Sequence, residues 1–263
     1  MRLYTLVLTS IASASLIACG GGGGSSATLS GGTPSPLINV PYYTPVRVGT
    51  AVISDVVTTE SAVAYSFNAD LTNSGSDNVI VAGRSLDAAR ADSKLSIYGW
   101  SNGALVDQTS QWLSGTDNVI GGTEPDVEIG DFNGDGLIDL YIAPSTDSDV
   151  SRGDPGVVLI NNGTSFSRTD INLGSVWAHD SVVYDFDGDG KSDIFNTEFG
   201  IGATLAISNG DGTFNIATNT SSAFAGASSV AAADFLGNGT TSVIITDSST
   251  NDQESTKLLS YAV

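Results

Sequence analysis

The 263-residue chain carries 29 acidic residues against nine basic ones, and its formal net charge is −20. Such a balance disfavours nucleic acid, which is bound through a basic stripe or patch, and it also disfavours anionic lipid headgroups. The single cysteine excludes a disulfide within the chain, and the 31 glycines without any helical period predict an all-β fold.

The amino terminus has the features of a secretion signal. Met1 and Arg2 precede an apolar stretch that ends in small residues, and this stretch is too short for a membrane span. The junction LIAC, which ends at Cys19, resembles the lipobox of bacterial lipoproteins, in which the cysteine becomes the lipid-modified first residue. Gly20 follows in place of an aspartate, which favours the outer membrane or cell surface over the inner membrane.

The next segment is a linker. Residues 19–36 are rich in glycine, serine, threonine and proline, and they lack the apolar side chains that a packed core needs. We therefore expect a signal peptide at 1–18, a flexible tether at 19–36 and one folded domain at 37–263.

Within that domain, a nine-residue acidic loop occurs twice, as DFNGDGLID at residues 131–139 and DFDGDGKSD at residues 185–193. Each loop offers side-chain oxygens at positions 1, 3, 5 and 9 and a glycine at position 6 for a sharp turn. A hard cation such as Ca²⁺ collects six to eight oxygens in this way. The two loops are therefore candidate calcium sites.

Two weaker copies, DLTNSGSDN at 70–78 and DFLGNGTTS at 234–242, retain the first aspartate, the glycine and a following apolar run. The four loops recur every 50–60 residues or so, a period typical of solenoids, propellers and arrays. Thr72, Ser74, Leu236 and Ser242 replace oxygen-rich positions of the stronger loops, so we expect metal at only two of the four.

An EF-hand is the main alternative for such a loop, but it requires a glutamate at position 12 and a helix on each side. Position 12 is Ile142 in one loop and Asn196 in the other, and the flanking residues are β-branched or aromatic. The pattern therefore predicts a strand-loop-strand site.

Each repeat contains a second strand pair around a turn. The runs LSIYGW at 95–100, VVLI at 157–160 and LAIS at 205–208 each lead into an Asn-Gly or related turn. Such turns supply the positive φ angles of tight hairpins. One repeat is thus about four short antiparallel strands, which is the composition of a propeller blade.

These motifs resemble the FG-GAP/VCBS repeat of integrin-alpha-type β-propellers over residues 60–263, most closely at 131–143 and 185–214. The resemblance implies Ca²⁺ bound between the first two strands of a blade. It implies side-chain ligands in both acidic loops and main-chain carbonyl ligands near Leu137 and Lys191. The implied side-chain ligands are Asp131, Asn133, Asp135 and Asp139 in one loop, and Asp185, Asp187, Asp189 and Asp193 in the other.

The number of blades leaves the architecture open. About four blades could close into a small propeller, with residues 44–52 supplying a missing strand, or remain a partial propeller whose edge needs a partner chain. Both alternatives are consistent with the sequence.

Two functions compete for such a scaffold. The first is a calcium-binding, surface-anchored module that binds glycan or protein ligands. The second is a polysaccharide lyase or hydrolase.

His179, the only histidine, is expected to be structural, and the tryptophans Trp100, Trp112 and Trp177 are expected to pack in the core or between blades. A catalytic carboxylate pair would have to come from the remaining acids, among them Asp147, Asp149, Asp154 and Asp170. Because no nucleophile or base is apparent, the binding module is favoured.

Overall fold

The computed structural model describes residues 62–85, 93–121, 125–143, 155–173, 178–198, 202–219, 227–247 and 256–260. All of these residues lie in one unit, Ile53–Val263. The predicted signal peptide, Cys19, the tether, the candidate closing strand at 44–52 and Trp177 lie outside the described residues. Within the described part of the chain, no helix is both long and apolar enough to cross a membrane.

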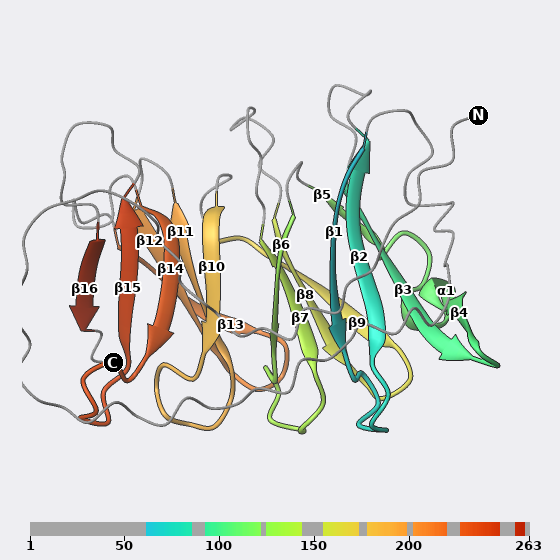
Figure 1. The fold of residues 1–263 in the computed structure, drawn as a ribbon. Coiled ribbons are helices and arrows are strands. Elements are labelled where there is room, and N and C mark those ends of the chain that lie inside the picture. The colour runs from blue at the N-terminus through green and yellow to red at the C-terminus, as the bar shows by residue number, and fades with distance from the viewer. Residues whose placement is uncertain are drawn as a thin grey trace, which may run out of the picture. The chain divides into compact units, whose positions relative to one another are not determined.

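The described strands form four antiparallel sheets, and each sheet is built from consecutive strands (Figure 1). The first sheet contains β1 (Ala62–Ala69), β2 (Asn78–Ser85), β3 (Ser93–Ser101) and β4 (Ala104–Asp107), with β5 (Val119–Gly121) paired to β3. The second contains β6 (Asp126–Gly130), β7 (Asp139–Ala143), β8 (Gly156–Asn161) and β9 (Phe166–Ile171). The third contains β10 (Ala178–Tyr184), β11 (Asp193–Glu198), β12 (Gly202–Ser208) and β13 (Phe214–Asn219). The fourth contains β14 (Ala227–Ala233), β15 (Ser242–Asp247) and β16 (Thr256–Ser260).

Local sequence explains the hairpins within the sheets. The β3–β4 connection is the pair Asn102 and Gly103, whose φ angles are 50° and 81°. Two successive positive φ angles match the right-handed twist of the flanking strands, and Asn-Gly adopts them at low cost. The expected all-β class is confirmed. The one-turn helix α1 (Thr109–Trp112), which the sequence analysis did not anticipate, inserts between β4 and β5.

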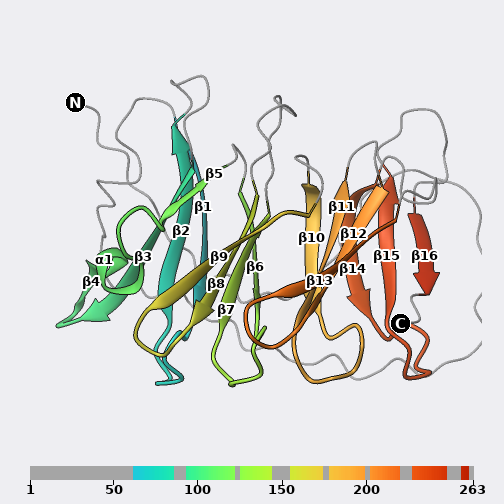
Figure 2. The same ribbon diagram turned by 180° about the vertical axis from the view of Figure 1, so that it is seen from behind.

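The sheets pack face to face in chain order, as the views from both sides show (Figure 1, Figure 2). Three apolar clusters fill the spaces between neighbouring sheets. The first joins Ile80 and Leu95 to Leu140 and Leu159, the second joins Tyr141 and Val158 to Ile194 and Ala206, and the third joins Phe195 and Leu205 to Val243 and Ile245.

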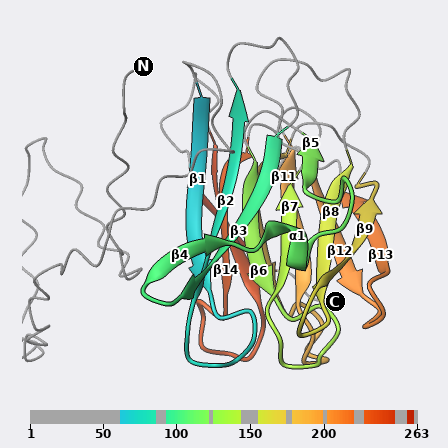
Figure 3. The same cartoon turned by 90° about the vertical axis from the view of Figure 1, so that its right-hand side faces the viewer.

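Middle strands are therefore covered on both faces. Figure 3 looks along the row of sheets, with β1 and β2 of the first sheet in front and β14 of the fourth behind. Every residue of β7 and of β11 is buried. This double coverage explains why β7 is an almost continuous apolar run rather than an alternating one. In β11 the same coverage also buries polar side chains, those of Asp193, Asn196, Thr197 and Glu198. Four-stranded antiparallel sheets stacked in this manner are consistent with propeller blades. Closure into a ring stays a prediction.

The exposed fraction of the side chain at loop position 2 depends on whether another sheet follows and packs against it. Leu71, Phe132 and Phe186 are at most 6% exposed, and each belongs to the apolar cluster shared with the following sheet. Phe132 meets Phe214 of the next sheet edge-on, with ring centroids 5.8 Å apart. Phe235, at the same position of the fourth sheet, is 42% exposed.

This contrast predicts unequal effects of truncating the two aromatic rings. Phe132→Ala should lower the free energy of unfolding by about 3–5 kcal/mol, because it removes a fully buried ring and leaves a cavity. Phe235→Ala should change it by no more than about 0.5 kcal/mol, as for most exposed side chains. Urea unfolding of both variants would check this. Equal losses would mean that Phe235 is covered in solution.

Candidate metal centre

The four repeat loops join the first two strands of each sheet and lie at the same end of their sheets (Figure 1). The first aspartate holds each loop by accepting main-chain N–H donors. Asp185 Oδ1 accepts bonds from Gly188 N at 2.7 Å and Asp189 N at 3.1 Å, and its Oδ2 accepts one from Gly190 N at 2.9 Å. The glycine at position 6 has φ between 79° and 86° in all four loops, a conformation that an L side chain rarely adopts. Glycine therefore fits this turn.

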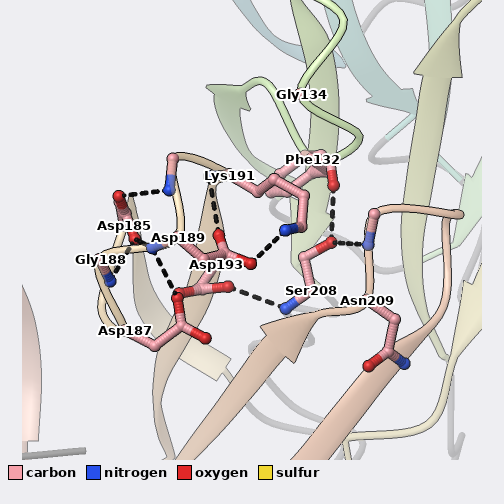
Figure 4. Close-up of polar contacts among 12 residues, drawn as sticks. Phe132, Gly134, Asp185, Asp187, Gly188, Asp189, Lys191, Asp193, Ser208 and Asn209 are labelled. Carbon is pink, nitrogen blue, oxygen red and sulfur yellow. Dashed lines mark hydrogen bonds and ion pairs between the residues drawn. The ribbon is translucent and has the colours of Figure 1, made fainter.

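The aspartate at position 9 is wholly buried and ties the loop to the sheet. Asp193 Oδ2 accepts a 2.8 Å bond from Phe186 N in the loop, and its Oδ1 accepts a 2.8 Å bond from Ser208 N at the end of β12 (Figure 4). Asp139 makes the same two bonds, to Phe132 N at 2.8 Å and Asn161 N at 2.7 Å. Both strong loops are thus fastened to the third strand of their own sheet.

Both buried carboxyls hold a proton more readily than usual. Burial raises the pKa of Asp193 to about 6, the N–H bonds of Ser208 and Phe186 lower it only in part, and the charges of Asp187 and Asp185 raise it further. The pKa of Asp139 is likewise raised to about 6, first by burial. Bound to the protein, a divalent cation would favour the ionised form of these groups and offset the repulsion.

The third-sheet loop brings three carboxylates together. Oxygens of Asp185, Asp187 and Asp193 lie within 4.8 Å of one another, the one such group within the described residues. Ligand oxygens about 2.3–2.6 Å from one calcium ion are at most about 5 Å apart. The spacing and the all-oxygen donor set therefore fit Ca²⁺.

The second-sheet loop has the same frame with one carboxylate fewer. Asp131 accepts bonds from Gly134 N, Asp135 N and Gly136 N at 2.7–3.1 Å, as Asp185 does in its loop. Asn133 takes the place of Asp187, and its Nδ2 donates to Asp135 Oδ2 at 2.9 Å. This loop offers an amide oxygen where the other offers a carboxylate.

Position 5 differs from the implied ligand set. Both carboxylate oxygens of Asp189 accept bonds from Lys191, one from its main-chain N at 2.9 Å and one from its ammonium group. This contact with Asp189 raises the pKa of Lys191. In the second sheet, Asp135 Oδ1 accepts a 2.8 Å bond from Leu137 N. The described contacts of Leu137 and Lys191 are thus through their donors, and a carbonyl ligand at either residue stays a prediction.

The outer loops keep the main-chain frame and the first aspartate, but they have no carboxylate at positions 3, 5 and 9. Asp70 accepts bonds from Ser74 N at 3.0 Å and Thr72 N at 3.2 Å, and Asp234 accepts bonds from Asn238 N and Gly239 N. Leu236 is 54% exposed at position 3 of the last loop. The loop shape therefore depends on the aspartate at position 1 and not on acidic residues at positions 3, 5 and 9.

Comparison with known proteins agrees with this geometry. The model of the FG-GAP-like repeat family matches residues 131–196 and 185–245. These segments are FG-GAP-like repeats. The matched residues include both acidic loops and the loop at Asp234, while the loop at Asp70 falls outside them. No curated protein matches the chain.

Two further groups from the sequence analysis have defined positions. Trp112 is in the core, 5.4 Å from Phe166 between ring centroids, whereas the packing prediction is wrong for Trp100, which is 49% exposed on β3. Asp170 is paired with Arg168 at 2.6 Å, and Arg168 also donates to the main-chain oxygens of Asp117 and Val119 in the first sheet. Asp170 therefore lies in an ion pair within β9, and the arginine of this pair also reaches the first sheet.

A second acidic group lies on the first strands of the sheets, and the sequence analysis missed it. Asp126 on β6 accepts bonds from the main-chain N (3.0 Å) and the hydroxyl of Ser181 on β10. Asp180 on β10 accepts bonds from Ser229 Oγ and Val230 N on β14, both at 2.7 Å. The only signal in the sequence was an acidic residue at the same offset before each strong loop.

Glu128 lies beside these aspartates. Burial, followed by the charges of Asp126 and Asp180, raises its pKa to about 8. Because the folded pKa exceeds the ordinary value of 4.5, the folded state holds a proton that the unfolded state has lost between these two pH values. Charged Glu128 thus makes the fold less stable as pH rises through this window.

The raised pKa of Glu128 predicts how the stability of Glu128→Gln depends on pH. In chelator, wild-type stability should fall relative to the variant from about pH 5 to pH 8, by at most about 1.4 kcal/mol per pH unit. Asp211→Asn is the control, since the hydroxyl and main-chain N of Thr213 lower the pKa of this exposed carboxyl. Its curve should stay parallel to wild type over the same range in denaturant titrations. A Glu128→Gln curve that is also parallel would contradict the assignment.

Proposed function

We propose that the chain is a calcium-stabilised binding module, held at the outer membrane or cell surface by a lipid on Cys19. The observation that carries the calcium assignment is the convergence of Asp185, Asp187 and Asp193 in a loop already shaped by main-chain bonds. FG-GAP-like repeats around this loop support it. A glycan or protein would be the ligand of the module, and the acidic surface argues against nucleic acid.

The cation would act on stability rather than on a reaction. Asp185, Asp187 and Asp193 would hold one ion, and Asp131, Asn133 and Asp139 would hold another. Two Ca²⁺ ions would neutralise four negative charges of a chain whose net charge is −20. Because the ions bind only the folded loops, they stabilise the fold by mass action.

Calcium titration tests this assignment. Calorimetry should give two sites, and calcium at a hundredfold excess over Kd should add about 2.7 kcal/mol per site, which raises Tm by about 5–10 °C for each. Asp187→Ala and Asn133→Ala should each remove or weaken one site, because these exposed or half-buried side chains leave the buried aspartates intact. Ser74→Ala, in the loop of the first sheet, is the matched control and should leave both sites. A Tm unmoved by chelator would overturn the calcium assignment.

Membrane attachment needs its own test. Cys19→Ser should release the protein from the membrane fraction, because the lipid is the proposed attachment and no other apolar segment of the sequence is long enough to replace it. Fractionation of cells that express either form, followed by a carbonate wash, would measure this. Retention of the serine form in washed membranes would contradict lipid anchoring.

A further inference from the structure

The two acidic loops are joined directly to each other. Ser192 N donates to Asp131 O at 2.8 Å, and Asp131 N donates to Ser192 Oγ at 3.0 Å. Asp131 is position 1 of the second-sheet loop, and Ser192 immediately precedes Asp193, position 9 of the third-sheet loop. A reciprocal pair of bonds therefore connects a candidate ligand residue of one site to the neighbour of a candidate ligand residue of the other.

Glycine makes this close approach possible. A Cβ atom on Gly130 would lie 2.6 Å from Val183 Cγ1 and 2.8 Å from Ser192 Cβ, distances that real Cβ atoms do not show. The equivalent residue before the other loops is Ala69, Tyr184 or Ala233. A Cβ on Gly134 would likewise lie 3.3 Å from Lys191 Cγ, so the lysine stem rests against the second-sheet loop (Figure 4).

A third bond fastens the same pair of loops. Ser208 Oγ donates to Phe132 O at 2.6 Å, and Ser208 N also donates to Asp193 (Figure 4). Position 2 of one loop and position 9 of the other thus share one serine. By contrast, the described bonds from the third to the fourth sheet join Asp180 to Ser229 and Val230 within the strands.

We propose that the two acidic loops bind divalent cations as a coupled pair, with Ser192 as the positioning residue that links them. The proposal rests on the calcium assignment made above. An ion at Asp185, Asp187 and Asp193 orders the segment that contains Ser192, and this segment holds the main chain of Asp131. The second ion then meets a loop that is already ordered, so each ion strengthens the binding of the other by the same factor.

Loop-specific titration measures this coupling. Calcium is added to the whole protein while the amide signals of Gly136 and Gly190 are followed by NMR, one in each loop. Asp187→Ala weakens the third-sheet loop and should also weaken calcium binding at Gly136 by about 3- to 10-fold, the effect of one net hydrogen bond. Ser192→Ala removes the Oγ acceptor of Asp131 N but keeps the main-chain donor of residue 192. In this background, Asp187→Ala should therefore weaken calcium binding at Gly136 less than it does in the wild type.

A second variant disrupts the same contact between the loops, and a third serves as the control. Gly130→Ala should reduce the coupling at least as much as Ser192→Ala does, because its methyl group cannot fit beside Val183 and Ser192. Thr241→Ala, at the position of Ser192 in the fourth-sheet loop, should leave the coupling intact. Melting curves in chelator establish that each variant is folded.

The outcomes separate the two proposals. A wild-type protein that binds no calcium at Gly136 or Gly190 overturns the proposed function and the coupling with it. Two calcium sites, with Gly136 unaffected by Asp187→Ala in the wild-type background, overturn the coupling alone. Coupling that is as strong in Ser192→Ala and Gly130→Ala as in the wild type overturns the role of Ser192.

Discussion

A buried carboxylate that accepts two main-chain N–H bonds connects the loop to the sheet in both strong repeats. Asp139 and Asp193 each bind the N–H of loop position 2 and the N–H at or just before the turn after the third strand. Without this bridge, two main-chain donors next to a fully covered strand would lose their partner, which is costly in a dry environment. The bridge also sets where the other acidic side chains can point.

The same bridge creates an electrostatic conflict. Placing a carboxylate out of water beside Asp185 and Asp187 disfavours its charge, and its pKa rises accordingly. Protonation relieves the conflict in acid, and a bound cation would relieve it at neutral pH. In the third sheet Lys191 supplies a positive charge from within the chain, and its pKa is raised first by its bond to Asp189 and also by the charges of Asp187 and Asp193. The first and fourth loops avoid the conflict because neutral residues stand at position 9, Asn78 and Ser242, both of them buried.

The sequence predicts the sheets well because their signals are local. A glycine at loop position 6, an apolar run after it and an Asn-Gly turn between strands each act on neighbouring residues only. The shape of both acidic loops follows from the same rules.

Features that depend on how sheets pack were not predictable in this way. Asp126 and Ser181 are 55 residues apart, and their contact requires β6 and β10 to be neighbours. The pairing of the Asp189 carboxylate with Lys191 depends on side-chain geometry, which cannot be read from the spacing of acidic residues in the sequence. Trp100 was misjudged because an aromatic residue in a strand gives no sign of being at an uncovered hairpin.

The links between first strands have a consequence for how such a chain can change over generations. Asp126 and Asp180 each reach the main-chain N–H of the next repeat, at Ser181 and Val230. Every residue except proline carries this donor, so the receiving repeat needs no particular side chain to accept its neighbour. A gene segment that encodes one repeat could therefore be copied, and the new unit would meet the preceding one through a bond already available. Repeats joined in this manner are free to diverge in sequence while their succession is preserved.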